Sequence, residues 1–291
     1  MVKKALAIDI GGTKIFSALI DETGKIIGEV RKNSTPGDLV GIIKILREII
    51  TQDEGFIDVV AISTAGAVNL ENNAVISATG NLPEGYRTID FPMLSKRPVF
   101  VENDANCAAW AEYKIGASKN LDNNITLTFG TGVGGGIIVN GKLMKGKSGS
   151  AGEMHFKMAL DEKRKCTCGA YDCFEIYTSG KGLILTAKDI LGKDLTTYEI
   201  IEGYKGGYPK FDEIMTTWRK NIAKGIVGLC NIFDPDCVVL SGSLAQFIET
   251  EPIQNYVNNE ISTMPTKIFH ASAGNYSGMI GAALLALEKF K

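Results

Sequence analysis

The sequence predicts an α/β protein assembled from two related halves. Residues 4–30 read as a strand, a glycine turn, a second strand, a hairpin turn and a third strand, and residues 124–144 repeat that order. Residues 38–50 carry apolar side chains at helical spacing, which indicates an amphipathic helix covering the first sheet. A chain of 291 residues has room for two such α/β domains. Further helices are expected over residues 179–193, 211–233 and 277–290.

Turn residues support this order of elements. Residues 21–25 (DETGK) suit a hairpin turn in which Gly24 takes a positive φ, and Asn140-Gly141 suits a type I′ turn. Residues 225–245 read as a helix, a break at Asp234-Pro235, a buried strand and a Gly-Ser turn. This late strand and turn form a third glycine-containing element.

Composition limits the classes of protein that fit. The formal charge of −2 argues against nonspecific binding of nucleic acid, which needs a basic excess. No apolar run approaches the ~18 residues of a membrane span. Two lysines precede only a short apolar run at the amino terminus, so no signal peptide is expected. We therefore expect a cytoplasmic protein without nucleic-acid or membrane partners.

Both glycine turns suit phosphate groups. Without Cβ atoms, the backbone N–H groups of residues 9–14 (DIGGTK) and 128–136 (TFGTGVGGG) can approach an anion closely. Thr13 adds a hydroxyl donor and Lys14 a positive charge. Neither turn matches a P-loop or a Rossmann fingerprint. The alternative is that these glycines only satisfy hairpin geometry.

Four polar residues interrupt an apolar stretch between residues 97 and 116. Glu102, Asn103, Asp104 and Asn106 lie where a strand gives way to an alanine-rich helix. Asn and Asp are favoured helix caps, which is one explanation for the group. Four polar side chains in five positions exceed what one cap requires, so a functional carboxylate is also indicated.

Three cysteines and a histidine form a candidate metal site. Cys166, Cys168 and Cys173 lie within eight residues, and His155 precedes them. Three thiolates and an imidazole form a closed, structural zinc site, and in a reducing compartment clustered cysteines favour metal over disulfide. A disulfide with a spare thiol is the alternative. The remaining cysteines are expected in the core: Cys107, Cys230 and Cys237.

The motifs resemble, in their order along the whole chain, those of the ROK family of sugar kinases and repressors. They are DIGGTK (9–14), ENDAN (102–106), GTGVGGG (130–136), AGEMH (151–155) with the cysteines, and SGS (241–243). The resemblance implies an actin-like ATPase (ribonuclease H-like) fold, with two α/β domains flanking a deep cleft. The smaller domain would comprise residues 1–115 and 277–291, with Gly278 and Gly281 at the hinge. Residues 116–276 would form the larger domain with its zinc loop.

The resemblance also implies an activity: an ATP-dependent hexose kinase that phosphorylates the 6-hydroxyl group. Glucose and N-acetylmannosamine are the leading substrates, with fructose and N-acetylglucosamine behind them. ATP, Mg²⁺ and a structural Zn²⁺ are the implied cofactors, and a homodimer the implied assembly. A sugar-responsive repressor is the alternative; it would need a helix-turn-helix ahead of the first strand, which begins at about Ala5.

Specific residues carry over from the family motifs. Asp104 is the implied general base. The implied sugar contacts are Thr79, Gly80, Asn103, Asp104, Glu153, His155 and Glu175. The implied ATP contacts are Asp9, Gly11, Gly12, Thr13, Lys14, Gly130, Thr131, Gly132, Gly134, Gly242 and Ser243. The implied zinc ligands are His155, Cys166, Cys168 and Cys173.

Two departures from the family pattern affect this assignment. The glycine that usually precedes the histidine is absent, so His155 either binds zinc alone or contacts both zinc and sugar. Asp172 stands where the family usually has glycine, and aspartate tolerates the left-handed conformation such a turn requires. For Glu175 the alternative is a solvated glutamate at a helix start, and for Gly242-Ser243 a plain strand-to-helix turn.

Overall fold

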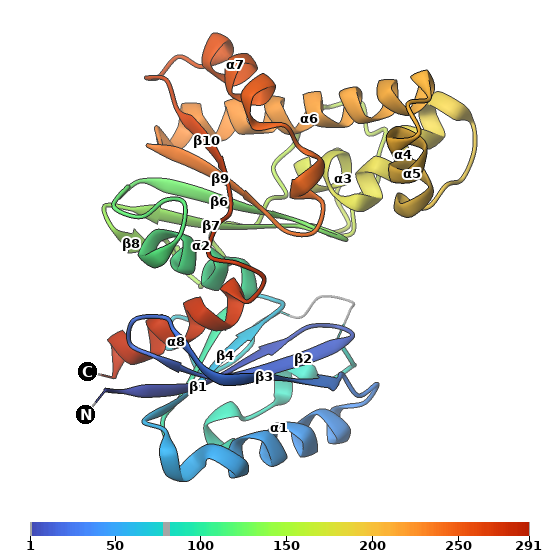
Figure 1. Cartoon of the computed structure of the whole chain (residues 1–291). Coiled ribbons are helices and arrows are strands. Elements are labelled where there is room, and N and C mark those ends of the chain that lie inside the picture. Colours follow the sequence, from blue (N-terminus) through green and yellow to red (C-terminus); the bar gives the residue numbers. More distant parts are fainter. Residues whose placement is uncertain (1, 78–81, 291) are drawn as a thin grey trace. The chain divides into compact units, whose positions relative to one another are not determined.

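The protein folds around two five-stranded sheets (Figure 1), which confirms the predicted α/β class. The structure, a computed structural model, describes residues 2–77 and 82–290. The first sheet has the order β3-β2-β1-β4-β5 and the second the order β10-β9-β6-β7-β8. Read from its other edge, the second sheet runs β8-β7-β6-β9-β10, the same topology as the first. The internal repeat expected from the sequence is therefore present in the strand order.

The strands of the first sheet are β1 (Lys4–Ile10), β2 (Lys14–Asp21), β3 (Ile26–Ser34), β4 (Val59–Thr64) and β5 (Val99–Asn103). Those of the second are β6 (Asn124–Phe129), β7 (Val133–Val139), β8 (Lys142–Leu143), β9 (Cys237–Ser241) and β10 (Lys267–His270). The α-helices are α1 (Leu39–Asp53), α2 (Asp104–Ile115), α3 (Phe174–Thr178), α4 (Gly180–Leu191), α5 (Thr197–Lys205), α6 (Pro209–Phe233), α7 (Thr250–Glu260) and α8 (Ser277–Lys289). Short 3₁₀ helices cover Glu54–Phe56, Tyr86–Thr88, Phe91–Leu94 and Ala245–Phe247.

Two compact units divide the chain. Unit 1 contains Met1–Asp122, Gly136–Gly152 and Ser272–Lys291, and unit 2 contains Asn123–Gly135 and Glu153–Ala271. These limits differ from the domain boundaries expected from the sequence, which stay a prediction. Within the described part of the chain, no helix is both long and apolar enough to cross a bilayer.

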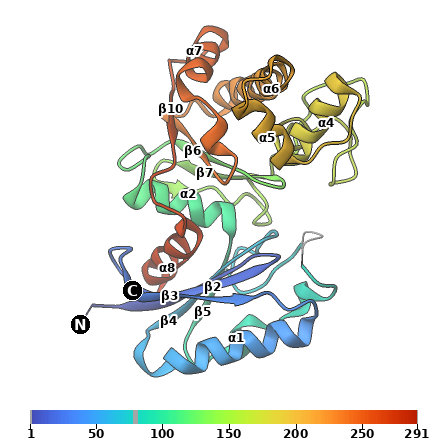
Figure 2. The same cartoon turned by 45° about the vertical axis from the view of Figure 1, so that its right-hand side comes forward.

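In unit 1, alternate residues of β1 face different helices. Leu6 and Ile8 pack in one apolar cluster with Leu46 of α1, while Ala5 and Ala7 pack in another with α8. Figure 2 shows α1 and α8 on opposite faces of this sheet. Because strand side chains alternate between the two faces, the large residues of β1 contact α1, and the small residues of β1 let α8 pack close to the sheet.

Helix α8 also packs tightly on α2, and Gly281 makes the close approach possible. A Cβ atom at Gly281 would lie 1.7 Å from the carbonyl oxygen of Cys107. The small side chains of α8 therefore allow close packing against α2 within unit 1. This packing accounts for Gly281, and the hinge expected at Gly278 and Gly281 stays a prediction.

Replacing Gly281 should destabilise the protein. We expect Gly281→Ala to lower the free energy of unfolding by about 1–3 kcal/mol, because the methyl group meets fixed backbone. Gly228→Ala is the matched control: it also lies in a helix, has open space around it, and should stabilise by ~0.5–1 kcal/mol. Urea unfolding of the parent, Gly281→Ala and Gly228→Ala measures both stability changes. Equal unfolding midpoints for Gly281→Ala and the parent would contradict the packing argument.

In unit 2, β9 pairs in parallel with β6 and β10, and α6 packs near α3 and α4. Trp218 of α6 is fully buried and donates from Nε1 to the carbonyl oxygen of Thr178, 2.9 Å away. The helices predicted over residues 38–50, 179–193, 211–233 and 277–290 are confirmed as α1, α4, α6 and α8. Helices α5 and α7 were not predicted, although the Thr196–Glu199 capping box marks the start of α5.

Candidate active site and metal centre

The ENDAN motif occupies the junction between β5 and α2 in unit 1. Asn103 caps the helix, because its Oδ1 accepts from the backbone N–H of Asn106 at 3.0 Å and its Nδ2 donates to the carbonyl oxygen of Gly66 at 3.0 Å. Asp104 is the first helical residue and is exposed, with Oδ1 accepting from the N–H of Ala105 at 2.8 Å. The helix N-terminus favours its negative charge. The motif thus combines a cap with an accessible carboxylate.

Glu102, like Asn106, is a member of this motif to which sequence reasoning assigned no specific role. It is only 1% exposed, and its carboxylate contacts Asn72, Asn103, Asn106 and Lys145. Asn72 and Lys145 lie far from Glu102 in the sequence, so no local pattern could have revealed the contact. One available signal was the position of Glu102 at the end of a buried strand.

The first glycine turn joins β1 to β2 in unit 1. Its residues 12–14 are exposed, and the N–H of Gly11 donates to the carbonyl oxygen of Lys14 at 3.0 Å. Asp9, just before the turn, accepts a 2.7 Å hydrogen bond from the hydroxyl of Ser63. Burial raises the pKa of the Asp9 carboxyl, and the hydrogen bond from Ser63 opposes that rise. Ser63 is a further residue that the sequence did not single out.

The second glycine turn joins β6 to β7. The N–H of Gly130 donates to the carbonyl oxygen of Gly132 at 3.0 Å, and Gly180 at the start of α4 donates to that of Gly130 at 2.8 Å. A Cβ atom at Gly132 would lie 2.6 Å from Oε2 of Glu175. Besides any phosphate role, Gly132 therefore leaves room for this carboxylate. Thr131 is exposed at the tip of the turn.

The third turn follows β9 and is held against the end of β6. Gly242 has φ +89°, and a Cβ atom there would lie 2.3 Å from the carbonyl oxygen of Phe129. The N–H of Leu244 donates to that same oxygen at 3.1 Å. Packing therefore explains the glycine, and Ser243 beside it is exposed. The adenosine contact of Gly242 and Ser243 stays a prediction.

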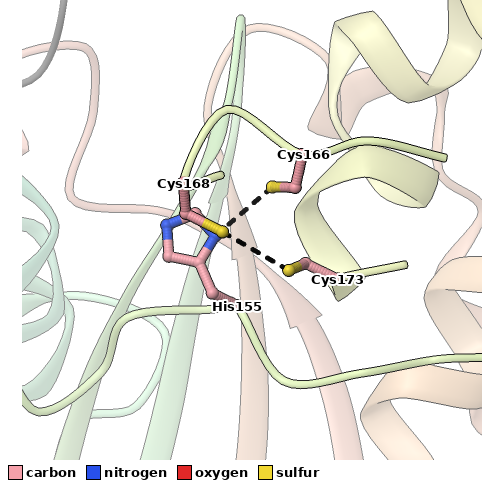
Figure 3. A group of neighbouring side chains, drawn as sticks. All are labelled: His155, Cys166, Cys168 and Cys173. Atoms are coloured by element: carbon pink, nitrogen blue, oxygen red, sulfur yellow. Dashed lines mark hydrogen bonds between the residues drawn. The ribbon is translucent and has the colours of Figure 1, made fainter. Parts of the chain in front are cut away.

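Three thiols and an imidazole converge in unit 2 (Figure 3). The donor atoms of His155, Cys166, Cys168 and Cys173 all lie within 4.8 Å of one another. The Sγ of Cys166 lies 3.7 Å from Nδ1 of His155, and the sulfurs of Cys168 and Cys173 are 3.5 Å apart. A tetrahedron with Zn–S bonds of ~2.3 Å has sulfur–sulfur edges of about 3.8 Å. The donor set and its spacing therefore fit Zn²⁺.

The histidine ring faces the thiols despite the missing glycine. Its Nδ1 is directed at Cys166, and its Nε2 lies 3.6 Å from Oε2 of Glu153. Asp172 has φ 58°, as expected for a residue that replaces glycine. Its carboxylate accepts from the N–H of Arg164 at 2.8 Å and from the hydroxyl of Tyr177 at 2.9 Å, which fixes the loop between the cysteines.

Glu175 connects the metal loop to the second glycine turn. It lies in the first turn of α3 and is half-buried rather than solvated. Its Oε1 accepts from the hydroxyl of Thr167 at 2.6 Å, and its Oε2 accepts from the N–H of Val133 at 3.1 Å. Thr167 lies between two of the proposed zinc ligands, so the metal loop and the carboxylate position are linked. Sequence reasoning did not identify Thr167.

The predicted site residues are distributed over both units. Asp9, the first turn, Asn103 and Asp104 belong to unit 1, whereas the second and third turns, Glu153, His155 and Glu175 belong to unit 2. Thr79 and Gly80 lie outside the described residues. Of the predicted sets, the four metal ligands are brought together. The sugar and ATP contacts stay predictions. Cys107, Cys230 and Cys237 are buried, as expected.

Comparison with known proteins identifies the family. A glucokinase of Streptomyces coelicolor is 31% identical over an alignment of 311 positions, and the match covers 97% of this chain and 97% of that protein. An N-acetylmannosamine kinase of Escherichia coli is 31% identical over 291 residues, covering 96% of this chain and 97% of that protein. The crystal structure of a ROK family glucokinase from Streptomyces griseus, in complex with glucose and AMPPNP, matches with a TM-score of 0.79 and 28% identity, covering 98% of this chain and 99% of that one.

These likenesses extend over the whole fold and confirm the predicted actin-like ATPase class. The profile of the ROK family itself matches residues 5–289. The chain therefore belongs to the ROK family.

Proposed function

We propose that this protein transfers the γ-phosphate of ATP to the 6-hydroxyl group of a hexose. The chain is a sugar kinase of the ROK family, and the acceptor hydroxyl, the sugar and the residue roles are the proposal. The observation that carries it is Asp104. An exposed carboxylate stands at the N-terminus of α2, directly after β5, in a chain that matches sugar kinases along its length.

Asp104 is the proposed acceptor of the sugar hydroxyl proton. In phosphoryl transfer the protein mainly positions the reactants and stabilises charge, and one group takes up the proton of the nucleophile. An alcohol loses this proton late, so an aspartate that is ionised near neutral pH suffices. Asn103, Glu153 and Glu175 are the proposed sugar contacts. The proposal also includes Thr79 and Gly80, and assigns His155 to zinc, with a sugar contact as the alternative.

Backbone groups of the two glycine turns are the proposed phosphate contacts. In the first turn these are Gly11, Gly12, Thr13 and Lys14, and in the second Gly130, Thr131, Gly132 and Gly134. Gly242 and Ser243 are assigned to the adenosine. Mg²⁺ bound with ATP uses mainly phosphate oxygens and one or two carboxylates, and it offsets the charge of the phosphoryl group. Asp9, beside the first turn, is the proposed carboxylate.

Glucose and N-acetylmannosamine are the proposed substrates, because the similar curated kinases are named for them. Fructose and N-acetylglucosamine are the alternatives. A cytoplasmic homodimer is part of the proposal and rests on the resemblance to the family alone.

A coupled ADP-release assay across a panel of hexoses tests the proposal. We expect turnover on the order of 1–100 s⁻¹ with one or two sugars, in the range usual for kinases. 6-Deoxyglucose is the matched control, since it lacks only the proposed acceptor, and it should give no ADP. Equal ADP release from 6-deoxyglucose and glucose, or ADP release independent of any hexose, would contradict the proposal.

A further inference from the structure

We propose that the buried pair Glu102–Lys145 is a positioning device that holds the turn of residues 103–106, and with it Asp104, in its working geometry. Lys145 and the turn of residues 103–106 both belong to unit 1, although they lie far apart in the sequence. The inference rests on the proposed role of Asp104 and adds a residue that sequence motifs do not mark.

The carboxylate of Glu102 has its hydrogen-bonding capacity filled. Its Oε1 accepts from the N–H of Asn103 at 2.9 Å and from Nδ2 of Asn106 at 3.1 Å. Its Oε2 accepts from Nδ2 of Asn72 at 2.7 Å and lies 2.8 Å from Nζ of Lys145. A carboxylate offers about four acceptor sites. One oxygen thus holds Asn103, directly before Asp104, and Asn106, two residues after it, and the other oxygen binds the groups that keep Glu102 in place.

Lys145 supplies the counter-charge. Its side chain is 16% exposed and that of Glu102 only 1%, so both charges are largely withdrawn from water. Its Nζ also donates to the carbonyl oxygen of Asn69 at 3.1 Å, which places it against the loop that carries Asn72. A buried carboxylate that loses its only direct cationic contact is strongly destabilised. Of the described lysines and arginines, Lys145 is the one that forms an ion pair with Glu102.

A second lysine supports the same loop without contacting Glu102 in an ion pair. Nζ of Lys289 donates to the carbonyl oxygen of Glu71 at 2.5 Å and lies 3.4 Å from Oδ1 of Asn72. Burial lowers the pKa of Lys289, and the charge of Lys145 lowers it further. The two ammonium groups are therefore close. Lys145 makes the direct ion pair with Glu102, and the charge of Glu102 also raises the pKa of Lys289 in part.

The backbone around Lys145 is fixed by close packing. Gly149 has φ +92°, and a Cβ atom there would lie 1.9 Å from the carbonyl oxygen of Val68. The N–H of Ala151 donates to the carbonyl oxygen of Lys145 at 3.2 Å. Asn72 has φ 62°, and its own carbonyl oxygen accepts from the N–H of Val101 at 2.8 Å. Three separate segments of unit 1 therefore meet at one carboxylate.

The predicted consequence of losing Lys145 is a displaced catalytic turn. Glu102 would turn toward other donors or water, and the N–H of Asn103 and the amide of Asn106 would lose their acceptor. A displacement of about 1 Å at a reacting group can lower a rate on the order of 100-fold. We expect Lys145→Met to lower kcat by about 100-fold and to change the sugar KM by less than about 3-fold. Lys145→Arg keeps the charge and should retain most of the rate.

A double-mutant cycle separates positioning from independent damage. Glu102→Gln keeps the size and shape of the side chain but replaces one oxygen by an NH₂ group and removes the charge, and it should also lower kcat. If the pair acts as a unit, the double variant Glu102→Gln/Lys145→Met should lose no more kcat than the more impaired single variant. If the two effects are independent, their fold-losses in kcat should multiply. Lys147→Met, an exposed lysine of the same segment, is the matched control and should keep the parent kcat.

Amide hydrogen exchange on the ligand-free protein tests the inference without any assay of activity. Lys145→Met should speed exchange in residues 103–107 and leave that of β9 unchanged; should it fail to fold, Glu102→Gln serves for the same comparison. Parent-like exchange at residues 103–107, or multiplying losses of kcat, would overturn the inference. A parent protein that phosphorylates no hexose would instead refute the proposed function, and the exchange result would still decide the positioning role.

Discussion

Asp104→Asn is expected to abolish most turnover while leaving sugar binding nearly intact. Asparagine keeps the shape and the helix-start position of the side chain but cannot accept the proton of the sugar hydroxyl. Loss of a general base costs about 10²–10⁴-fold in rate. We therefore expect kcat to fall within that range and the sugar Kd to change by less than about 3-fold, because the neutral amide can still bind a hydroxyl group.

The measurements are kcat from coupled ADP release and sugar Kd from titration calorimetry. Asp212→Asn provides a matched control, since Asp212 is also an exposed aspartate in the first turn of a helix and should tolerate the change. Unchanged turnover in Asp104→Asn would remove Asp104 as the base. A much weaker sugar affinity with an unchanged kcat at saturating sugar would instead assign Asp104 to sugar binding.

Removal of the proposed Zn²⁺ is expected to produce the second large effect, through the position of Glu175. The thiols of Cys166 and Cys168 flank Thr167, whose hydroxyl binds Glu175. Burial and the neighbouring thiols raise the pKa of Cys173 to about 12, which disfavours its thiolate unless a cation is bound. Bound Zn²⁺ would supply the charge that keeps the thiols ionised and the loop closed.

Cys173→Ser should therefore lose zinc and raise the sugar KM on the order of 10–100-fold, as is usual for groups that support a bound ligand indirectly. Elemental analysis should find an equimolar amount of zinc in the parent protein. Cys230→Ala, which changes a buried cysteine of α6, should keep the metal. Thr167→Val should keep the metal yet still weaken sugar binding, because it removes the hydroxyl that holds Glu175. A metal-free parent protein with full activity would refute the zinc assignment.

At Asp172 and Gly132 the local conformation was predictable, but the tertiary contacts were not. The family's glycine at this position implied a left-handed turn, and the dihedral tolerance of aspartate indicated that Asp172 could adopt it, as it does. Neither could indicate that the same carboxylate binds Arg164 and Tyr177, because those contacts require the folded loop. Gly132 fitted a phosphate turn, yet its missing Cβ also makes room for Glu175.

Asn103 had two explanations, and the structural one is confirmed while the sugar contact stays a prediction. Its cap on α2 was a stated alternative to a functional role, and the cap is present. A capping side chain fixes where the helix begins, which in turn places Asp104 at the exposed first position. The sugar contact proposed for Asn103 thus depends on a residue that already has a structural task.

Sequence alone was enough to predict the α/β class, the two strand–turn–strand units and the order of the glycine turns, since periodicity and turn chemistry are local properties. The order of the strands within each sheet came from the structure. The sequence also identified the four metal ligands as candidates, because their residue types are rare and three of them are clustered. Only the tertiary structure decided which distant groups meet: Lys145 and Asn72 at Glu102, Ser63 at Asp9, and Thr167 at Glu175. Such pairings arise when separate segments pack together, and the burial that gives them their strength does not exist in the unfolded chain.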